Sequence, residues 1–176
     1  PGNAIAIIGA GGIAIDTALF VLQGNKPKEI TEFTTQWGID TTFQHRGGII
    51  PETEHTRTDR QIFMLQRSNK KPGAMLGKTT GWIHRAQLQM KQVAMHGGVN
   101  YEEITPEGLL VSDGPERANP RLIPADTIVL CAGQVSERRL ADDLLKLGLT
   151  PHIIGGADHA GELDAKRAID QGARLA

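Results

Sequence analysis

The chain has 176 residues, long enough to bury a hydrophobic core in one domain, or in one domain and part of another. Its 19 Lys and Arg residues against 20 Asp and Glu residues give a net charge of -1, which argues against a nucleic-acid or membrane partner. No apolar run approaches the roughly 20 residues of a membrane span. The single cysteine, Cys131, excludes an internal disulfide and a cysteine metal site. We therefore expect a soluble, cytoplasmic protein that is a piece of a longer polypeptide.

The N-terminal segment combines an apolar strand, a glycine-rich turn and an apolar helix. The run Ala4–Ile8 is continuously apolar, as in a strand that is buried on both faces of a parallel sheet. A helix is predicted over Ile13–Leu22. A strand, a turn and a helix in this order form the usual dinucleotide-binding unit.

The turn between them, GAGGIA at residues 9–14, fits the pattern G-x-G-x-x-A. In that pattern Gly9 permits the tight turn, Gly11 lets the backbone approach a pyrophosphate, and Ala14 allows close packing of helix on strand. The helix N-terminus beside Gly12 supplies amides and a positive dipole end. We predict that these four residues hold a dinucleotide; glycines that serve only to end a strand are the alternative.

The remaining elements alternate between strand and helix. Residues 24–60 are polar with little periodicity, and we interpret them as an insertion with some local structure. The predicted elements after it are a strand at 62–65, a helix at about 80–96, an antiparallel hairpin at 98–114, a strand within 126–133, a helix at 140–149, a strand at 152–158 and a helix at 161–176. This alternation predicts a Rossmann-like α/β fold in three layers, with a parallel sheet and a small antiparallel sheet.

The choice of cofactor depends on the end of the second strand, where an acid favours NAD and an arginine accommodates the 2′-phosphate of NADP. The strand QIFML is followed by Arg67, which can bond a phosphate bidentately. Further residues that we expect to assist it are Ser68, Lys70, Lys71 and Lys78. Glu29 and Glu32 lie about 20 residues past the glycines and are the competing acids, but their segment makes a poor central strand. NADPH is therefore favoured, and a solvated basic loop without a ligand is the alternative.

The segment GAMLGKTTG resembles a loop that binds nucleoside triphosphates. However, only three residues separate Gly73 from Gly77, where that motif has four. We therefore predict an ordinary loop, with Lys78 and Thr79 at the start of the second helix, close enough to Arg67 to help with the adenosine phosphate.

Several stretches together resemble the C-terminal part of the bacterial NADPH-dependent 2,4-dienoyl-CoA reductases. These stretches are IGAGGIAIDTA, WGID, MLQR, KPG, LGKTTGWIHR, VLCAGQ and IGGADHAGELDAKRAIDQGARLA, and they cover essentially the whole chain. The resemblance implies that NADPH reduces FAD, and that electrons then pass through an iron–sulfur cluster to FMN, which reduces an unsaturated fatty acyl-CoA. It places the NADPH pyrophosphate on the glycine turn and the extra phosphate on Arg67.

The same resemblance implies two domains. Residues 1–135 would be the NADPH-binding domain, with the insertion at 24–60, and residues 136–176 a C-terminal fragment of the FAD-binding domain. Gly133 lies in the turn that returns to the FAD half, and Asp158 matches an acid that contacts FAD in flavin disulfide reductases; the alternative for Asp158 is a helix N-cap.

The cofactors other than NADPH are expected in the rest of the parent enzyme. FAD, FMN and the iron–sulfur cluster are not expected on this piece, whose partners would be the remaining domains of the parent. We expect no catalytic residue or metal ligand here, and no activity from the fragment alone. Two other readings stay open: an ADP-binding or structural domain like that of the amine dehydrogenases, and a free-standing dinucleotide-binding module.

Overall fold

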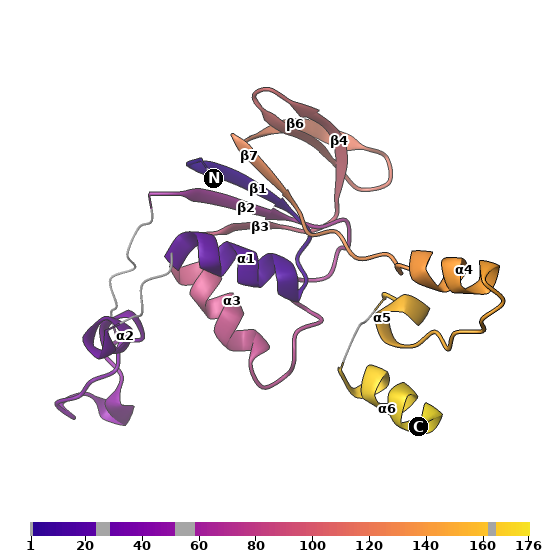
Figure 1. The fold of residues 1–176 in the computed structure, drawn as a ribbon. Helices are drawn as coiled ribbons and strands as arrows, with labels where there is room; N and C mark the ends of the chain where they lie inside the picture. The colour runs from indigo at the N-terminus through magenta and orange to yellow at the C-terminus, as the bar shows by residue number, and fades with distance from the viewer. Residues whose placement is uncertain (1, 24–28, 52–58, 162–164) are drawn as a thin grey trace. The chain divides into compact units, whose positions relative to one another are not determined.

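The computed structural model describes residues 2–23, 29–51, 59–161 and 165–176 (Figure 1). By its internal contacts the chain divides into two compact units, Pro1–Ala132 and Gly133–Ala176. None of the helices among the described residues has the length and apolar character needed to cross a membrane.

A parallel sheet of four strands forms the centre of the first unit, in the order β3-β2-β1-β7. The strands are β1 (Ala4–Ile8), β2 (Gln61–Leu65), β3 (Ala94–His96) and β7 (Thr127–Leu130). In the middle of the sheet, Ile5 of β1 pairs with Ile62 of β2 and with Thr127 of β7. The predicted strands at 4–8, 62–65 and within 126–133 are confirmed.

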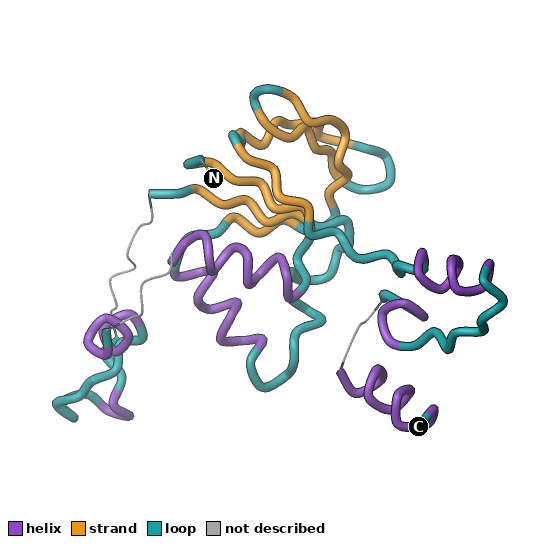
Figure 2. The backbone as a smooth tube through the Cα atoms, viewed as in Figure 1, coloured by secondary structure: helices purple, strands orange, loops and turns teal. Residues whose placement is uncertain are grey.

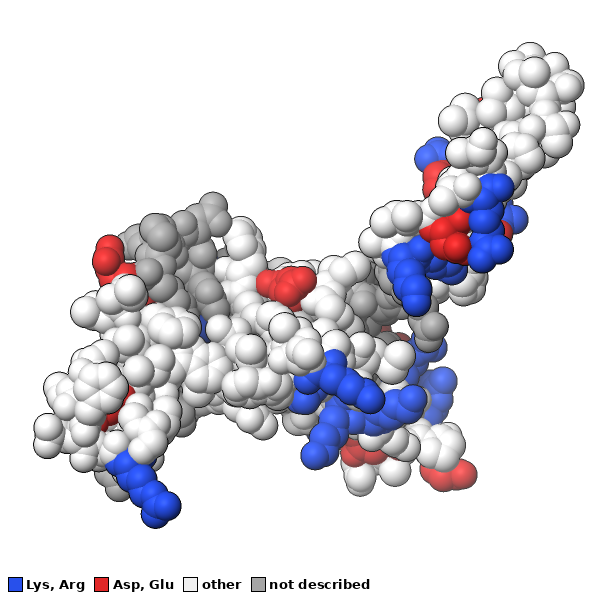
Figure 3. Space-filling view, turned by 90° about the horizontal axis from the view of Figure 1, so that it is seen from below, with Lys and Arg blue, Asp and Glu red and all other residues white. Residues whose placement is uncertain are grey.

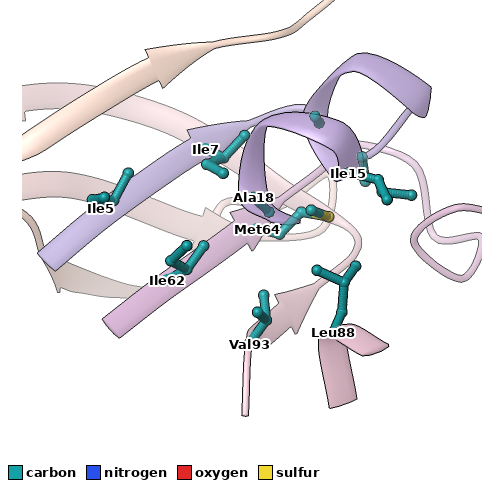
Figure 4. Packing of buried hydrophobic residues seen from close by; sticks show 10 residues of the cluster. Ile5, Ile7, Ile15, Ala18, Ile62, Met64, Leu88 and Val93 are labelled. Atoms are coloured by element: carbon teal, nitrogen blue, oxygen red, sulfur yellow. The ribbon is translucent and has the colours of Figure 1, made fainter. Parts of the chain in front are cut away.

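Two helices, α1 (Gly12–Gln23) and α3 (Gly81–Met90), cover one face of this sheet (Figure 1). Alternate strand residues point to opposite faces, so one set of side chains from β1 and β2 meets the helices. Figure 4 shows the buried side chains that pack there: Ile5, Ile7, Ile62 and Met64 from the strands, Ile15 and Ala18 from α1, Leu88 from α3, and Val93. The buried side chains of α1 and α3 therefore pack on this face of the sheet.

A three-stranded antiparallel sheet covers the opposite face (Figure 2). Its strands are β4 (Val99–Thr105), β5 (Gly108–Asp113) and β6 (Ala118–Pro124). The intervening residues of the parallel strands, Ala6, Ile8, Phe63 and Leu65, are buried against Val99, Leu109, Val111, Ile123 and Ala125. The parallel sheet is therefore buried on both faces, and the predicted three-layer α/β fold is confirmed.

One predicted boundary was wrong and two strands were missed between residues 80 and 124. The helix expected to reach His96 ends at Met90, and Gln92 has a positive φ of 55°. The residues after it form β3, which pairs with β2 from Phe63↔Ala94 to Leu65↔His96. Three residues carry too little periodicity to indicate a strand, and the third antiparallel strand, β6, was missed beside the predicted hairpin.

The predicted insertion has local structure in its described part, residues 29–51. It contains α2 (Ile30–Gln36), a 3-10 turn at Arg46–Gly48 and an antiparallel bridge between Ile39 and Ile49. The rings of Phe33 and Trp37 lie 6.3 Å apart, one helical turn from each other. These contacts are all local, which agrees with a small insertion that carries its own structure.

The second unit contains three helices among its described residues: α4 (Arg139–Lys146), α5 (Gly155–Asp158) and α6 (Ala165–Leu175). The helix predicted at 140–149 is confirmed as far as Lys146, where it ends, and the helix predicted at 161–176 is confirmed over Ala165–Leu175. The strand predicted at 152–158 was wrong. Gly155 has a positive φ of 60°, and its amide donates to the side chain of Gln171 at 2.8 Å. This hydrogen bond joins the start of α5 to α6, and residues 152–158 belong to neither sheet.

Candidate functional site

The carboxyl ends of the four parallel strands meet at one edge of the sheet, where ligands of such folds bind. Backbone hydrogen bonds join the segments that leave this edge. The amide of Gly9 donates to Leu65 at 2.7 Å, that of Cys131 to Ile8 at 2.8 Å, and that of Gln66 to His96 at 2.9 Å. The glycine turn and the basic turn after β2 therefore start from neighbouring points.

The glycine turn has the geometry that its sequence pattern predicts. Gly9 has a φ of 127°, and a Cβ there would lie 2.3 Å from the carbonyl oxygen of Cys131. Gly11 and Gly12 are exposed, and a Cβ on either would meet no atom within 4 Å. Ala14, in the first turn of α1, is completely buried. Gly9 and Ala14 thus serve packing, whereas Gly11 and Gly12 leave open space at the N-terminus of α1.

The segment that resembles a triphosphate loop is an ordinary connection tied to this turn. The amide of Gly73 donates to the carbonyl of Ala10 at 3.0 Å, and Arg85 of α3 donates to the carbonyl of Gly73, also at 3.0 Å. Helix α3 begins at Gly81, so Lys78 lies in the exposed loop before it and not in the helix as predicted.

The basic turn after β2 is exposed and internally bonded. Its predicted ligand-binding residues, Arg67, Ser68, Lys70 and Lys71, are all exposed. Figure 3 shows Lys and Arg side chains gathered near the middle of the face seen from below, and a separate group interspersed with Asp and Glu. The Gln66 side-chain amide donates to the carbonyl of Ser68 at 3.0 Å and also to that of Lys70. The amide of Lys70 donates to the Ser68 hydroxyl at 3.2 Å. The turn therefore has a defined shape.

Tyr101 of β4 is a residue at this edge that sequence reasoning missed. Its hydroxyl donates to the carbonyl of Leu65, the last residue of β2, at 3.0 Å. Burial raises the pKa of the Tyr101 phenol above its ordinary value of 10.0, and the positive charge of Arg67 opposes that rise. Arg67 and the partner of the Tyr101 hydroxyl, Leu65, are two residues apart at the end of β2. No local pattern in the sequence marks this pairing, because β4 is far from β2 along the chain.

The competing acids do not occupy a strand end. Glu29 lies at the N-terminal boundary of α2 and Glu32 lies in its first turn. The strand beside β1 is β2, which leads to Arg67. The prediction that QIFML, and not KEITEF, forms the second strand is therefore confirmed.

Two predicted residues belong to the second unit. Gly133 has a φ of 112° and open space where a Cβ would stand. Asp158 ends α5, and its carboxylate accepts a hydrogen bond from Gln171 at 2.9 Å and lies 3.9 Å from Arg167. Because α6 begins at Ala165, Asp158 is not its N-cap. A contact between Asp158 and FAD stays a prediction.

A bonded cluster in the insertion was also missed. The carboxylate of Asp40, which is only 5% exposed, accepts hydrogen bonds from the Thr42 hydroxyl at 2.6 Å and from the His45 amide at 2.7 Å. Nδ1 of His45 lies 2.9 Å from the same carboxylate. These bonds, first that from the Thr42 hydroxyl, hold the pKa of Asp40 well below its ordinary value of 3.8. The cluster shapes the loop from Asp40 to His45.

Two other features lie away from the glycine turn. A cavity of about 580 Å³ opens at the amino ends of β1 and β2, the edge opposite to the one where ligands of this fold bind. Among the described residues, no three His, Cys, Asp or Glu side chains form a group that could hold a metal ion.

Sequence comparison finds a distant relative. None of the protein-family models matches the chain. A metal reductase of Desulforamulus reducens is 28% identical over 140 residues, which cover 79% of this chain and 20% of the relative. The chain thus spans about a fifth of the length of this curated relative.

Structural comparison finds several oxidoreductases. A 2-naphthoyl-CoA reductase matches 99% of this chain and 21% of its own with a TM-score of 0.63 at 19% identity. Histamine dehydrogenase of Rhizobium sp. 4-9 matches 99% of this chain and 21% of its own with a TM-score of 0.64 at 13% identity. Bacillithiol disulfide reductase of Staphylococcus aureus matches 82% of this chain and 32% of its own with a TM-score of 0.50 at 14% identity. The chain therefore shares the α/β fold of a segment of these enzymes.

Proposed function

We propose that the chain is the NADPH-binding module of a larger flavin-dependent oxidoreductase that resembles the 2,4-dienoyl-CoA reductases. When bound, NADPH would supply a hydride to FAD held by the rest of the protein. The observation that carries the proposal is the open cradle at Gly11 and Gly12, which lies at the N-terminus of α1 beside a strand that leads to Arg67.

The cradle fits a pyrophosphate. Because a Cβ at Gly11 or Gly12 would meet no protein atom within 4 Å, the space over this turn is free for a ligand. The first amides and the positive end of the α1 dipole favour an anion there. Gly9 and Ala14 support the cradle, since the first permits the turn and the second lets α1 pack closely on the sheet.

The basic turn fits a 2′-phosphate. Arg67 follows the strand next to β1, at the position where this fold meets the adenosine ribose. A guanidinium can donate two parallel hydrogen bonds to a phosphate, and Lys70, Lys71 and Lys78 add positive charge. We assign Ser68 to the same group because its side chain lies in the exposed turn.

The names of the similar proteins support the class of reaction. The metal reductase, the 2-naphthoyl-CoA reductase and the bacillithiol disulfide reductase are reductases, and each is longer than this chain. A reductase whose substrate is an aromatic acyl-CoA is chemically related to the proposed reduction of an unsaturated fatty acyl-CoA. FMN, an iron–sulfur cluster and the FAD partners of Gly133 and Asp158 belong to the same proposal for the whole protein.

A second candidate is a structural or ADP-binding module. Histamine dehydrogenase matches 99% of this chain, as the 2-naphthoyl-CoA reductase does. An amine oxidase of Pseudomonas geniculata N1 matches 98% of it with a TM-score of 0.63. ADP lacks a 2′-phosphate, so this candidate leaves the basic turn without a ligand.

Calorimetric titration of the 176-residue chain with NADPH, NADH and ADP distinguishes the two candidates. The proposal expects tighter binding of NADPH, by about tenfold or more, because a bidentate charged pair contributes more than about 1.4 kcal/mol. Arg67→Ala should remove the preference. Arg117→Ala, which removes an equal charge from the turn before β6, should leave it intact. Equal affinity for all three ligands would favour the ADP-binding module, and binding of none would favour the structural one.

A further inference from the structure

We propose that Gln66 is a positioning residue for cofactor selection: it holds the basic turn in the shape that receives the 2′-phosphate, without contacting the phosphate itself. This inference rests on the proposed function. It concerns a residue that separates the last residue of β2 from Arg67 and that bears no charge.

The side-chain amide of Gln66 closes the turn from inside. Its nitrogen donates to the carbonyl oxygens of Ser68 and Lys70, which lie two and four residues further along the chain. Both partners are acceptors, so they use the two hydrogens of the amide nitrogen. The backbone from Ser68 to Lys70 is thereby folded around the Gln66 side chain.

The backbone of Gln66 fixes the same residue to the sheet. Its amide donates to the carbonyl of His96 at 2.9 Å, and its carbonyl accepts from the amide of Val99 at 3.2 Å. Gln66 therefore joins the end of β2 to the segment between β3 and β4. The backbone of Gln66 is bonded to the sheet and its side chain to the turn, so Gln66 fixes the turn relative to the sheet.

The glycine pair Gly97–Gly98 supports the turn from outside. The amide of Gly98 donates to the carbonyl of Ser68 at 3.0 Å. A Cβ at Gly97 would lie 2.9 Å from that carbonyl oxygen, and a Cβ at Gly98 would lie 2.0 Å from Oδ1 of Asn69. The basic turn thus packs directly on the backbone of Gly97 and Gly98, and a side chain at either position would collide with it.

Selectivity follows from this shape. Ordering a long exposed side chain on binding costs free energy, and a preformed turn avoids the further cost of ordering its backbone. Only the 2′-phosphate needs this turn, because the pyrophosphate binds at the glycine turn on β1. Loss of the Gln66 bonds should therefore weaken binding of 2′-phosphorylated ligands and leave ADP unaffected.

The test compares adenosine 2′,5′-bisphosphate, NADPH and ADP on the full 176-residue chain. Gln66→Met keeps the length of the side chain but removes the amide, and we expect the preference for the 2′-phosphorylated ligands to fall about tenfold. The dissociation constant for ADP and the thermal midpoint should stay near the wild-type values. Gln61→Met, the same change at the exposed amino end of β2, is the matched control.

Gly98→Ala displaces the turn from the other side while Gln66 stays in place, and it should reduce the same preference. Its control is Gly114→Ala, at a glycine that also has a positive φ but has open space around a Cβ. Retained preference in both Gln66→Met and Gly98→Ala would overturn the inference. An equal loss for ADP would also overturn it, because Gln66 would then act on the whole fold. A wild-type chain without preference would overturn the proposed function itself.

Discussion

Gly9 and Cys131 are in backbone contact across the carboxyl edge of the sheet: a Cβ on Gly9 would stand 2.3 Å from the carbonyl oxygen of Cys131. Because Gly9 also has a φ of 127°, two independent constraints exclude a side chain at this position. The start of the glycine turn is therefore a packing requirement of the sheet, whether or not a ligand binds.

Gly9→Ala should destabilise the first unit by about 1–3 kcal/mol through backbone strain. The clash between the new Cβ and the carbonyl oxygen of Cys131 should add to this loss. Urea unfolding followed by circular dichroism measures the change. Gly12→Ala is the control, because a Cβ there meets nothing within 4 Å. It should be neutral or stabilising by up to about 1 kcal/mol, as expected for alanine in a helix. Equal stability of the two variants would contradict the packing role of Gly9.

Gly11→Ala should separate binding from folding. The added methyl group has free space in the protein, so stability should stay within about 0.5 kcal/mol of the wild type. The same methyl group occupies the space proposed for the pyrophosphate, and we expect NADPH affinity to fall by about tenfold or more. Calorimetric titration measures the loss. Gly77→Ala, where the nearest atom to a Cβ is 3.8 Å away, should bind like the wild type. An unchanged affinity in Gly11→Ala would place the ligand elsewhere.

Tyr101 reports on the position of Arg67. It is the single tyrosine of the sequence, so the ultraviolet absorbance of phenolate follows one group. We expect a titration midpoint above 10.0, because burial disfavours the charged phenolate. Arg67→Ala should raise the midpoint further, since it removes a positive charge that stabilises the phenolate. An unchanged midpoint in that variant would contradict the proximity of Arg67 and Tyr101.

The Asp40 cluster should lose its order in acid. The folded state lowers the pKa of Asp40, so its contribution to stability is present above the ordinary value of 3.8 and is lost as the pH falls below it. Hydrogen-exchange protection of the Thr42 and His45 amides measures this, because both donate to the carboxylate. Asp40→Asn should reduce that protection at neutral pH and remove its acid dependence. Asp143→Asn, in the second unit, should leave the protection unchanged, and protection that persists in Asp40→Asn would contradict the role of the carboxylate.

Much of the candidate site could be predicted because its information is local. A strand, a turn with three glycines and an apolar helix follow one another within residues 4–23, and Arg67 comes two residues after a short apolar run. Continuous apolar runs identified β1, β2 and α1. The error at residues 152–158 has the same origin, because a short apolar run does not distinguish a strand from a helical turn.

The amino-acid sequence by itself determined the glycine turn, the strands β1, β2 and β7, and the basic residues after the second strand, since each depends on neighbours along the chain. Only the tertiary structure decided that β3 completes the parallel sheet, that Tyr101 reaches Leu65, and that Gly97–Gly98 lies against the basic turn. These contacts join segments about 30 residues apart. Their partners are selected by pairing and packing in three dimensions, which no local pattern of residues records.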